Sequence, residues 1–449
     1  MSKVMLAFLG VTNYKKCNYY FDENIKYEAV RFVQEAIIST ICKDWSSADK
    51  VIIFLTDKAM RVNWFDNGHS DGKTKKPLEI EGLKTRLEKL DLSVQIKPVK
   101  SLPTGKNSDE IWEIFDRIVE VVEEGDEVFF DITHAFRSLP MLALIALNYL
   151  RVVKKIEIKG VYYGAFEVIL DEFPDKKIYE IPIQDRNAPI FDLMPFIQLF
   201  DWTNATDNFI DYGDAQSLKK ITSEDITPLL AKSQGKNELV KNIDICSKLL
   251  ERFTEVIRTS RGYDLIYSDF YDTLKDNISI VGKAFYNPLI PLLDSIKEKI
   301  APFKNEDINN GFLAVQWCID YNLIQQGITL LQETVITLLI DKYYKKKEYL
   351  KDPDIREFIS DVIHLEAKST PRNEWKIKKR FRKDIDGVLK LLDKKIISHF
   401  ETLRHIRNDI NHAGFTETGE SPRSPKVLKN KLEEYYQKIK GYFNNTTND

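Results

Sequence analysis

An arginine and a histidine stand five residues apart near the carboxyl end of the chain, in the run Arg404–Gly414. The imidazole of a histidine titrates near neutral pH, so His412 can take up or release a proton during a reaction. The guanidinium of Arg407 can stabilise negative charge that builds on a phosphate in a transition state. Asn408 follows the arginine and could orient either group. These three residues are candidates for acid–base chemistry on a phosphodiester.

The helix that must position this pair is amphipathic and ends just after it. Phe400, Leu403 and Ile410 lie at helical spacing and predict its buried face. Arg407 falls on that same face, where a charged residue is costly unless it is paired or used. Gly414 supplies a natural helix stop.

The spacing leaves two interpretations open. In one, Arg407 forms an ion pair with Glu333 or Asp341, and His412 is an ordinary solvent-exposed residue. In the other, the arginine and the histidine act together. Five residues on a straight helix place two side chains about 140° apart. The pair could then converge only if the helix ends near Asn411, or if a second copy of the chain faces the first.

A polar turn near the amino terminus could hold a phosphate. The run Gly10–Lys15 follows a short apolar segment, and its glycine lets the backbone approach a ligand closely. Thr12 and Asn13 offer hydrogen-bond donors. The second and third glycines of the dinucleotide-binding fingerprint are missing. A plain turn from strand to helix would use the same residues.

A second polar turn joins an apolar strand to an apolar helix and holds Thr133, His134, Arg137 and Ser138. A helix N-terminus has unpaired N–H groups and partial positive charge, so it binds anions readily. The planar fork of Arg137 suits phosphate. The alternative is simple helix capping by a hydroxyl, with the arginine paired to a neighbour.

Strand and helix patterns alternate over roughly the first 180 residues, which predicts an α/β domain with a mostly parallel sheet covered on both faces. The predicted strands are Val4–Leu9, Val51–Leu55, Val94–Val99, Glu127–Asp131, Ile156–Tyr163, Glu167–Leu170 and Lys177–Ile181. The predicted helices are Asn24–Thr40, Leu78–Leu90, Asp109–Val122 and Leu139–Leu150. Ligands of such sheets bind beyond the carboxyl ends of the strands, where both polar turns fall.

Beyond Pro189, long amphipathic stretches replace the strand patterns. The predicted helices here are Leu239–Ile257, Ile280–Ile300, Phe312–Leu339 and Leu389–Ile410. The expected organisation is a Rossmann-like α/β domain over 1–185, an all-α connector over 186–300 and an all-α domain over 301–449.

The composition shows little charge bias, because 66 Lys and Arg residues stand against 69 Asp and Glu residues. Any contact with nucleic acid must therefore use local basic patches. The basic run Arg372–Lys383, with Trp375 and Phe381 between its charges, is one candidate, and Lys345–Lys347 lies nearby in sequence. A solvated helix face would give the same pattern.

The four cysteines, Cys17, Cys42, Cys246 and Cys318, have no paired spacing, which fits a reducing compartment. No apolar run reaches the roughly 20 residues that a membrane helix needs. We therefore expect a cytoplasmic protein without a membrane span, and neither a metal site nor a resident cofactor.

The amino-terminal turns resemble a known family. Asp131–Pro140 is similar to the signature of the CARF domain, the Rossmann-like sensor of CRISPR-associated proteins, and Leu9–Tyr14 and Asp192–Phe196 resemble other parts of that domain. The resemblance covers about residues 1–200. It implies a homodimer that binds one cyclic oligoadenylate across its two-fold axis. The implied ligand-binding residues are Gly10, Thr12, Asn13, Thr133, His134, Arg137 and Ser138.

The carboxyl-terminal run resembles a second family. Arg407–His412 matches the R-x4–6-H motif of HEPN ribonucleases, and Tyr321–Glu333 is similar to their upstream helix. That family acts as dimers with Arg and His from both copies in one cleft, which would answer the angular problem. A CARF domain followed by a HEPN domain resembles the auxiliary ribonucleases of type III CRISPR systems.

The combined resemblance implies an endoribonuclease of antiviral defence that is activated by cyclic tetra- or hexa-adenylate. Its catalytic residues would be Arg407, His412 and Asn408, and it would cut single-stranded RNA without a metal, leaving a 2′,3′-cyclic phosphate and a 5′-hydroxyl. Thr12, Thr133 and His134 also suggest slow cutting of the messenger by the sensor. The alternatives are a non-catalytic CARF sensor and a Rossmann enzyme that uses a nucleotide cofactor.

Overall fold

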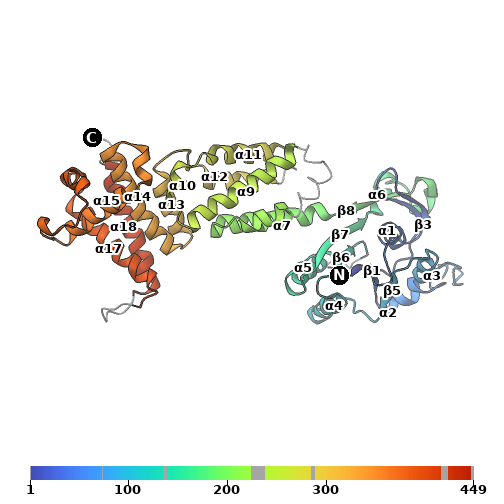
Figure 1. Ribbon diagram of the computed structural model, residues 1–449. Coiled ribbons are helices and arrows are strands. Elements are labelled where there is room, and N and C mark those ends of the chain that lie inside the picture. Colours follow the sequence, from blue (N-terminus) through green and yellow to red (C-terminus); the bar gives the residue numbers. More distant parts are fainter. Residues whose placement is uncertain are drawn as a thin grey trace. The chain divides into compact units, whose positions relative to one another are not determined.

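The computed structural model describes residues 2–72, 74–134, 139–223, 238–284, 289–415 and 423–445. The chain divides into two compact units, Met1–Gln198 and Leu199–Asp449 (Figure 1). The first unit holds every strand among the described residues, and the second is helical throughout its described part.

An eight-stranded sheet forms the centre of the first unit, in the order β3-β2-β8-β7-β6-β1-β4-β5. Five neighbouring strands, β7, β6, β1, β4 and β5, run parallel, while β3 and β8 each make one antiparallel pairing. The strands are β1 Lys3–Leu9, β2 Cys17–Tyr20, β3 Lys26–Val30, β4 Lys50–Leu55, β5 Gln95–Val99, β6 Glu127–Asp131, β7 Glu157–Gly164 and β8 Asn187–Asp192. The prediction of a mostly parallel α/β domain is confirmed.

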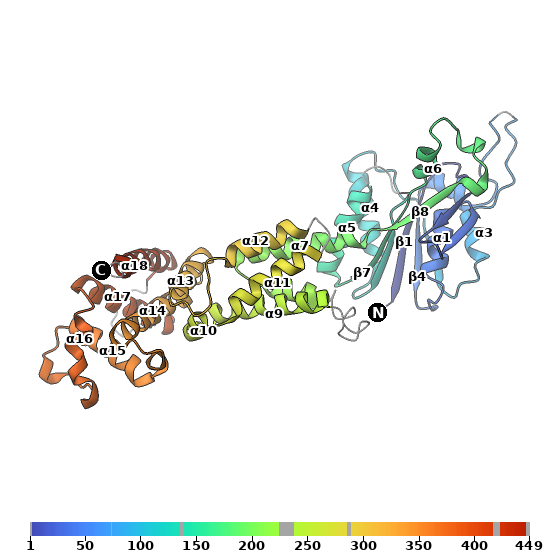
Figure 2. The ribbon, with the colours of Figure 1, turned by 90° about the horizontal axis from the view of Figure 1, so that it is seen from above.

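Helices cover both faces of this sheet (Figure 2). Residues 4–9 of β1 and 51–55 of β4 are all buried, which explains why both strands are apolar after their first lysine. One face packs against α1 and α3, and the other against α4 and α5. The helical segments of this unit before β8 are α1 Val33–Ile41, α2 Asp57–Ala59, the π-helical turn η1 Met60–Trp64, α3 Leu83–Glu88, α4 Ser108–Glu120, α5 Leu139–Val153, α6 Glu167–Glu172 and the 3-10 turns η2 Ile178–Glu180 and η3 Ile183–Asp185.

The strand order reverses between β1 and β6. Strand β1 pairs in parallel with β4 on one side and with β6 on the other, so the chain crosses to opposite sides of this point. Ligands of open α/β sheets bind at such a switch point, beyond the carboxyl ends of the strands. The turns after Leu9 and Asp131 therefore open at the same edge of the sheet.

Three predicted elements of the first unit are wrong. The predicted helix Asn24–Thr40 is instead strand β3 followed by helix α1. The predicted strand Glu167–Leu170 lies in helix α6, and the predicted strand Lys177–Ile181 contains only the short 3-10 turn Ile178–Glu180. Strand β8 lies at Pro189, where strands were expected to end.

The second unit contains the helices α9 Glu238–Arg258, α10 Gly262–Tyr267, α11 Phe270–Ala284, α12 Ile290–Ile300, α13 Asn310–Asp320, α14 Ile324–Tyr344, α15 Pro353–Ala367, α16 Ile385–Leu389, α17 Lys394–Asn411 and α18 Pro425–Asn445. Helix α7, Met194–Tyr212, begins in the first unit and continues into the second. The 3-10 segments η5 Lys347–Lys351, η6 Arg372–Glu374 and η7 Lys379–Asp384 connect α14, α15 and α16. The predicted helix Phe312–Leu339 is two helices, and Asn322 between them has a positive φ of 58°.

Helix α14 is the core of the second unit. Its residues from Gly327 to Ile340 are buried on nearly every side, as expected of a helix that others surround. It packs against α13, α15, α17 and α18. No helix in the described ranges is long and apolar enough to cross a membrane.

Candidate functional site

The two polar turns of the first unit meet at the switch point. A Cβ atom added at Gly10 would lie 2.2 Å from the Tyr14 hydroxyl oxygen and 3.8 Å from the Cβ of His134. The rings of Tyr14 and His134 lie 4.4 Å apart, measured between centroids. Only glycine fits here without displacing the tyrosine, so the first turn depends on the absence of a side chain.

Asn63, a buried residue of η1, fixes the backbone of the first turn. Its Nδ2 donates hydrogen bonds to the carbonyl oxygens of Gly10 and Thr12, each at 2.9 Å. Its Oδ1 accepts a hydrogen bond from Arg31 at 3.0 Å and lies 2.9 Å from His69 Nε2. Sequence reasoning missed Asn63, because no local pattern marks a residue whose partners lie 51 and 53 positions away in the chain.

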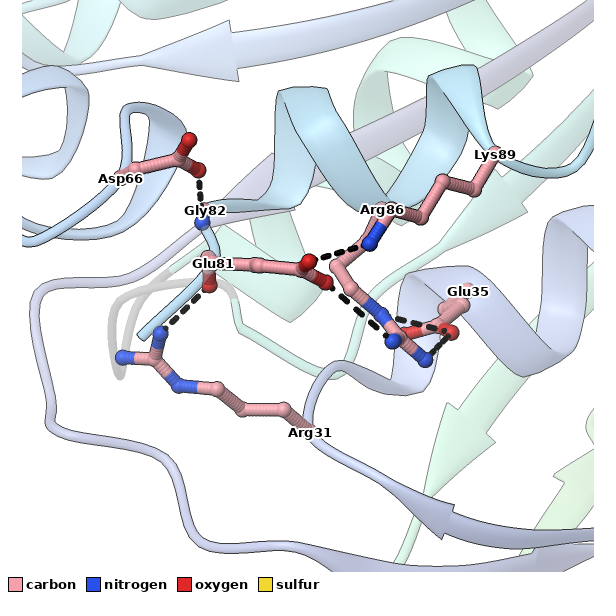
Figure 3. Close-up of polar contacts among 7 residues, drawn as sticks. All are labelled: Arg31, Glu35, Asp66, Glu81, Gly82, Arg86 and Lys89. Carbon is pink, nitrogen blue, oxygen red and sulfur yellow. Dashed lines mark hydrogen bonds and ion pairs between the residues drawn. The ribbon is translucent and has the colours of Figure 1, made fainter. Parts of the chain in front are cut away.

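A charged network continues from Arg31 to α3 and α1 (Figure 3). Arg31 Nη1 donates to the carbonyl oxygen of Glu81 at 2.8 Å. The Glu81 carboxylate pairs with Arg86 and Lys89, and Arg86 also pairs with the buried Glu35 of α1. These contacts connect η1, whose Asn63 holds the first turn, to α3 and α1.

Thr133 closes the second turn against its neighbours. Its Oγ1 accepts a hydrogen bond from the Gly164 N–H at 2.8 Å, and its own N–H donates to Asp131 Oδ1 at 2.9 Å. Asp131 is fully buried, and burial raises the pKa of its carboxyl to about 6, against the opposing hydrogen bonds from Thr133. Its Oδ2 has no hydrogen-bond partner among the residues that the structure describes.

His134 places a second unsatisfied polar atom at the same edge. Burial lowers the pKa of its imidazole to about 4, so the ring is neutral at pH 7. The side chain is partly exposed, yet Nε2 is buried and lacks a hydrogen-bond partner in the described part of the chain. Buried polar atoms are normally hydrogen-bonded, so Nε2 and Asp131 Oδ2 mark a site where a ligand could supply the hydrogen-bond partners.

The other predicted ligand-binding residues stand as follows. Thr12 and Asn13 lie on the first turn, and the Thr12 side chain is exposed. Arg137 and Ser138 lie outside the described residues. The structure thus brings Gly10, Thr133 and His134 together.

Helix α17 positions the candidate catalytic residues of the second unit. It buries Phe400, Leu403, Ile406 and Asp409, whereas Ile410 is only half-buried, so the buried face differs from the predicted one. The buried residues from Phe400 to Asp409 follow one another every three residues, so the buried face passes through Asp409 and not through Ile410. Arg407 lies at the border of that face, half-buried.

His412 caps the helix. Its N–H bonds back to the carbonyl oxygens of Asn408 and Ile410, and the next two residues, Ala413 and Gly414, have positive φ values of 53° and 74°. The N–H of Gly414 donates to the carbonyl oxygen of residue 409 at 2.9 Å, which ends the helix in a left-handed turn. Asn408 and His412 are both exposed to solvent.

Two polar groups beside this terminus are unsatisfied. Arg407 Nε is buried without a hydrogen-bond partner among the described residues, and so is Asp409 Oδ1. Asp409 Oδ2 lies 3.3 Å from Arg423 Nη1. The described residues hold no ion pair of Arg407 with Glu333 or with Asp341, and Glu333 pairs with Arg356 instead.

The basic run 372–383 does not offer its aromatic rings to a ligand. Trp375 is buried and donates from Nε1 to the carbonyl oxygen of Thr370, and Phe381 stacks on Phe358 in the core. Lys378 pairs with Asp354 and Glu357. The hypothesis that these two rings stack on RNA bases is wrong, because both belong to the hydrophobic core.

A match to a known protein family falls within the first unit. Residues 4–167 match the family model of the CARF domain of the CRISPR system endoribonuclease Csx1. The CRISPR-associated protein MJ1674 of Methanocaldococcus jannaschii is 24% identical over 461 aligned positions, which cover 94% of this chain. The chain spans 63% of the length of that relative.

Among solved structures, Enterococcus italicus Csm6 bound to cyclic hexa-2′-fluoro-hexa-dAMP is similar at 12% identity and a TM-score of 0.43, over 98% of this chain and 95% of that one. Both polar turns of the first unit fall within the residues that match the CARF model. The two sequence matches support a CRISPR-associated protein that carries a CARF domain at residues 4–167.

Proposed function

We propose that this protein is an endoribonuclease of CRISPR antiviral defence, which cuts single-stranded RNA after a cyclic oligoadenylate binds its first unit. One observation supports this most: Gly10, Thr133 and His134 meet at the switch point of a sheet whose sequence matches a CARF domain. The Csx1 named by that model is an endoribonuclease.

The proposed activator site takes phosphates and adenine bases at the two turns. Nε2 of the neutral His134 imidazole has no hydrogen-bond partner in the described part of the chain, so it can bond to the messenger. Arg137 and Ser138 would add phosphate contacts at the start of α5. The proposed enzyme is a homodimer that holds one cyclic tetra- or hexa-adenylate between two copies of this edge.

The proposed reaction uses the RNA's own nucleophile. The exposed His412 removes the proton of the 2′-hydroxyl or gives a proton to the leaving 5′-oxygen. Arg407 stabilises the charge on the pentacoordinate phosphorus, and the exposed Asn408 orients one of these groups. The unsatisfied Arg407 Nε fits a group that a substrate or a second copy of the chain completes. DNA lacks the 2′-hydroxyl and is not cut.

The test is an RNase assay of the full chain with cyclic tetra-adenylate and, separately, cyclic hexa-adenylate. Wild type should cut labelled single-stranded RNA with one of the two rings, and Arg407→Ala and His412→Ala should cut at least a hundredfold more slowly, the lower range of a lost acid–base group (about 10²–10⁴). His399→Ala, which removes a histidine of α17 whose ring lies against Tyr435, is the matched control and should keep its rate. Equal rates in all variants would refute the assignment of these residues.

A non-catalytic CARF sensor is the second candidate. It is favoured by the family match, which ends at residue 167 and does not reach α17. Under this function, wild type binds the messenger but cuts no RNA with either ring. The same assay therefore separates the two candidates.

Slow cutting of the messenger by the sensor is a subsidiary proposal. Thr133 and His134 lie where the ring would bind, and Thr12 exposes a hydroxyl on the opposite turn. Incubation of the His412→Ala chain with radiolabelled cyclic oligoadenylate should produce linear fragments. An intact ring after prolonged incubation would exclude this activity.

A further inference from the structure

The second unit contains a cavity of about 600 Å³ that the proposed catalytic residues do not use. It lies between α10 and the middle of α14, with the end of η5 and Arg356 of α15 at its border. Its volume falls within the range of roughly 300–1,000 Å³ that small-molecule sites occupy. All of its lining residues belong to the second unit.

Tyr263, Tyr267 and Lys351 form one part of the cavity wall. The rings of Tyr263 and Tyr267, one turn apart on α10, are stacked with centroids 4.8 Å apart. Lys351 Nζ lies 3.7 Å from the centroid of the Tyr263 ring, and Lys347 Nζ lies 5.9 Å from that of Tyr267. Tyr263 is 41% exposed, so this wall is accessible from solvent.

Other lining residues offer hydroxyl groups and a neutralised ion pair. Arg356 pairs with Glu333 and donates to Thr337 Oγ1 at 3.1 Å and to the carbonyl oxygen of Leu350 at 3.0 Å. The guanidinium and the carboxylate therefore satisfy each other. Among the described residues that line the cavity, Lys351 is exposed and adds a positive charge beside this ion pair, which favours an anionic ligand.

The cavity lies close to the end of α17. Gln325 Nε2 donates to Asn411 Oδ1 at 3.3 Å, and Asn411 immediately precedes His412. Thr329, which lines the cavity, is four residues after Gln325 and therefore one turn further along the same face of α14, about 6 Å away. A chain molecule bound at the helix end would need to extend only a short way to reach the cavity.

We propose that the cavity binds one unpaired base of the RNA substrate, which stacks on Tyr263 while Lys351 moves from the ring to the adjacent phosphate. This inference rests on the proposed function. Every base has a flat face, so such stacking tolerates any sequence, and it is stronger than an exposed contact between a lysine and a ring. The lysine covers the tyrosine in the free protein and gives way to the base.

The test measures RNA binding by the full chain with His412→Ala, so that the RNA stays intact. The probe is a 5′-fluorescein-labelled single-stranded RNA, followed by fluorescence anisotropy, with cyclic tetra-adenylate and with cyclic hexa-adenylate. Adding Tyr263→Ala or Lys351→Ala should each weaken binding about tenfold. Tyr263→Phe keeps the ring and should bind like the parent.

Matched controls come from the same unit. Tyr212→Ala removes a tyrosine that is 66% exposed on α7, and Lys241→Ala removes an exposed lysine on α9. Both should bind RNA like the parent. If Tyr263→Ala does not fold, Lys351→Glu decides, because it changes an exposed side chain and should weaken RNA binding at least as much as Lys351→Ala.

The outcomes separate the two proposals. Wild type that cuts RNA, with cavity variants that bind it like the parent, would overturn the base site and leave the nuclease standing. A parent that binds no RNA would also overturn the base site. Wild type that cuts no RNA, with cavity variants that lose binding, would overturn the nuclease and support the base site.

Discussion

The ring of Tyr14 packs on the ring of His134, and this contact joins the turn after β1 to the turn after β6. The Tyr14 phenol is buried, which raises its pKa well above the ordinary range, against an opposing hydrogen bond with the Gly10 backbone. It therefore stays protonated at neutral pH. A ligand that displaces either ring must change the conformation of both turns.

The first prediction concerns Gly10→Ala. The added Cβ would lie 2.2 Å from the Tyr14 hydroxyl oxygen, so the tyrosine must leave His134. We expect the affinity for cyclic oligoadenylate to fall at least tenfold, measured by isothermal titration calorimetry. Gly72→Ala is the control, because its added Cβ would meet nothing within 4 Å. Unchanged affinity in Gly10→Ala would show that the first turn does not take part in binding the ligand.

The second prediction concerns Asn63→Ala. The change removes both hydrogen bonds to the first turn and leaves the carbonyl oxygens of Gly10 and Thr12 unpaired. The free energy of unfolding should fall by about 2–3 kcal/mol, at roughly 1 kcal/mol for each lost bond plus the cost of unpaired groups. Urea unfolding measures this, and Asn24→Ala, an exposed residue, should change it little. An equal effect of both changes would mean that Asn63 does not hold the turn.

The third prediction is that Asp131 and His134 oppose each other in their effect on stability between pH 4 and 6.5. The carboxyl pKa is raised by burial to about 6, so its contribution is full below the unfolded value near 4 and is lost as pH rises through 6. The imidazole pKa is lowered to about 4, so its contribution is present above the unfolded value near 6.5 and is lost as pH falls toward 4. Each shift is worth about 3 kcal/mol, and the two largely cancel.

Single substitutions should reveal the separate contributions of Asp131 and His134 to the pH dependence of stability. In Asp131→Asn only the imidazole still titrates. Its unfolding free energy should therefore fall by about 3 kcal/mol as the pH is lowered from 6.5 to 4, whereas that of wild type should change little. His134→Gln leaves the carboxyl, so stability should rise by a similar amount over the same interval. Chemical denaturation at both pH values measures this. Parallel pH profiles in wild type and both variants would contradict the burial of these groups.

The fourth prediction concerns the charged network of Figure 3. Arg86→Ala leaves the buried carboxylate of Glu35 without its partner, which should cost about 3 kcal/mol of unfolding free energy. Lys84→Ala breaks an exposed pair with Glu88 on the same helix and should cost less than about 0.5 kcal/mol. Thermal and urea unfolding compare the two. Similar small losses would show that Glu35 is solvated when unpaired.

The central strands and the meeting of the two turns were predictable from sequence. Strands that are buried on both faces must be apolar, and β1 from Val4 to Leu9 and β4 from Val51 to Leu55 follow that rule. Gly10 and His134 could be expected to approach, because each follows a strand at the carboxyl edge of a parallel sheet. Physical rules that act locally were sufficient for this part.

The edge of the sheet was not predictable. Strands β2, β3 and β8 are short and mixed in polarity, so no local pattern marks them. Their stability comes from distant pairing: Asn18 pairs in register with Asn187, and its Nδ2 donates to the carbonyl oxygen of Ile183. The buried position of Trp375 likewise depends on tertiary packing, whereas its basic neighbours suggested a surface.

The most direct measurement of the central claim is the rate of RNA cutting in EDTA, with and without cyclic oligoadenylate, with the product ends identified by mass spectrometry. The account predicts cutting only with the messenger, undiminished by the chelator, and fragments ending in 2′,3′-cyclic phosphate and 5′-hydroxyl. Cutting that ignores the messenger, stops in EDTA or leaves 5′-phosphate ends would contradict it.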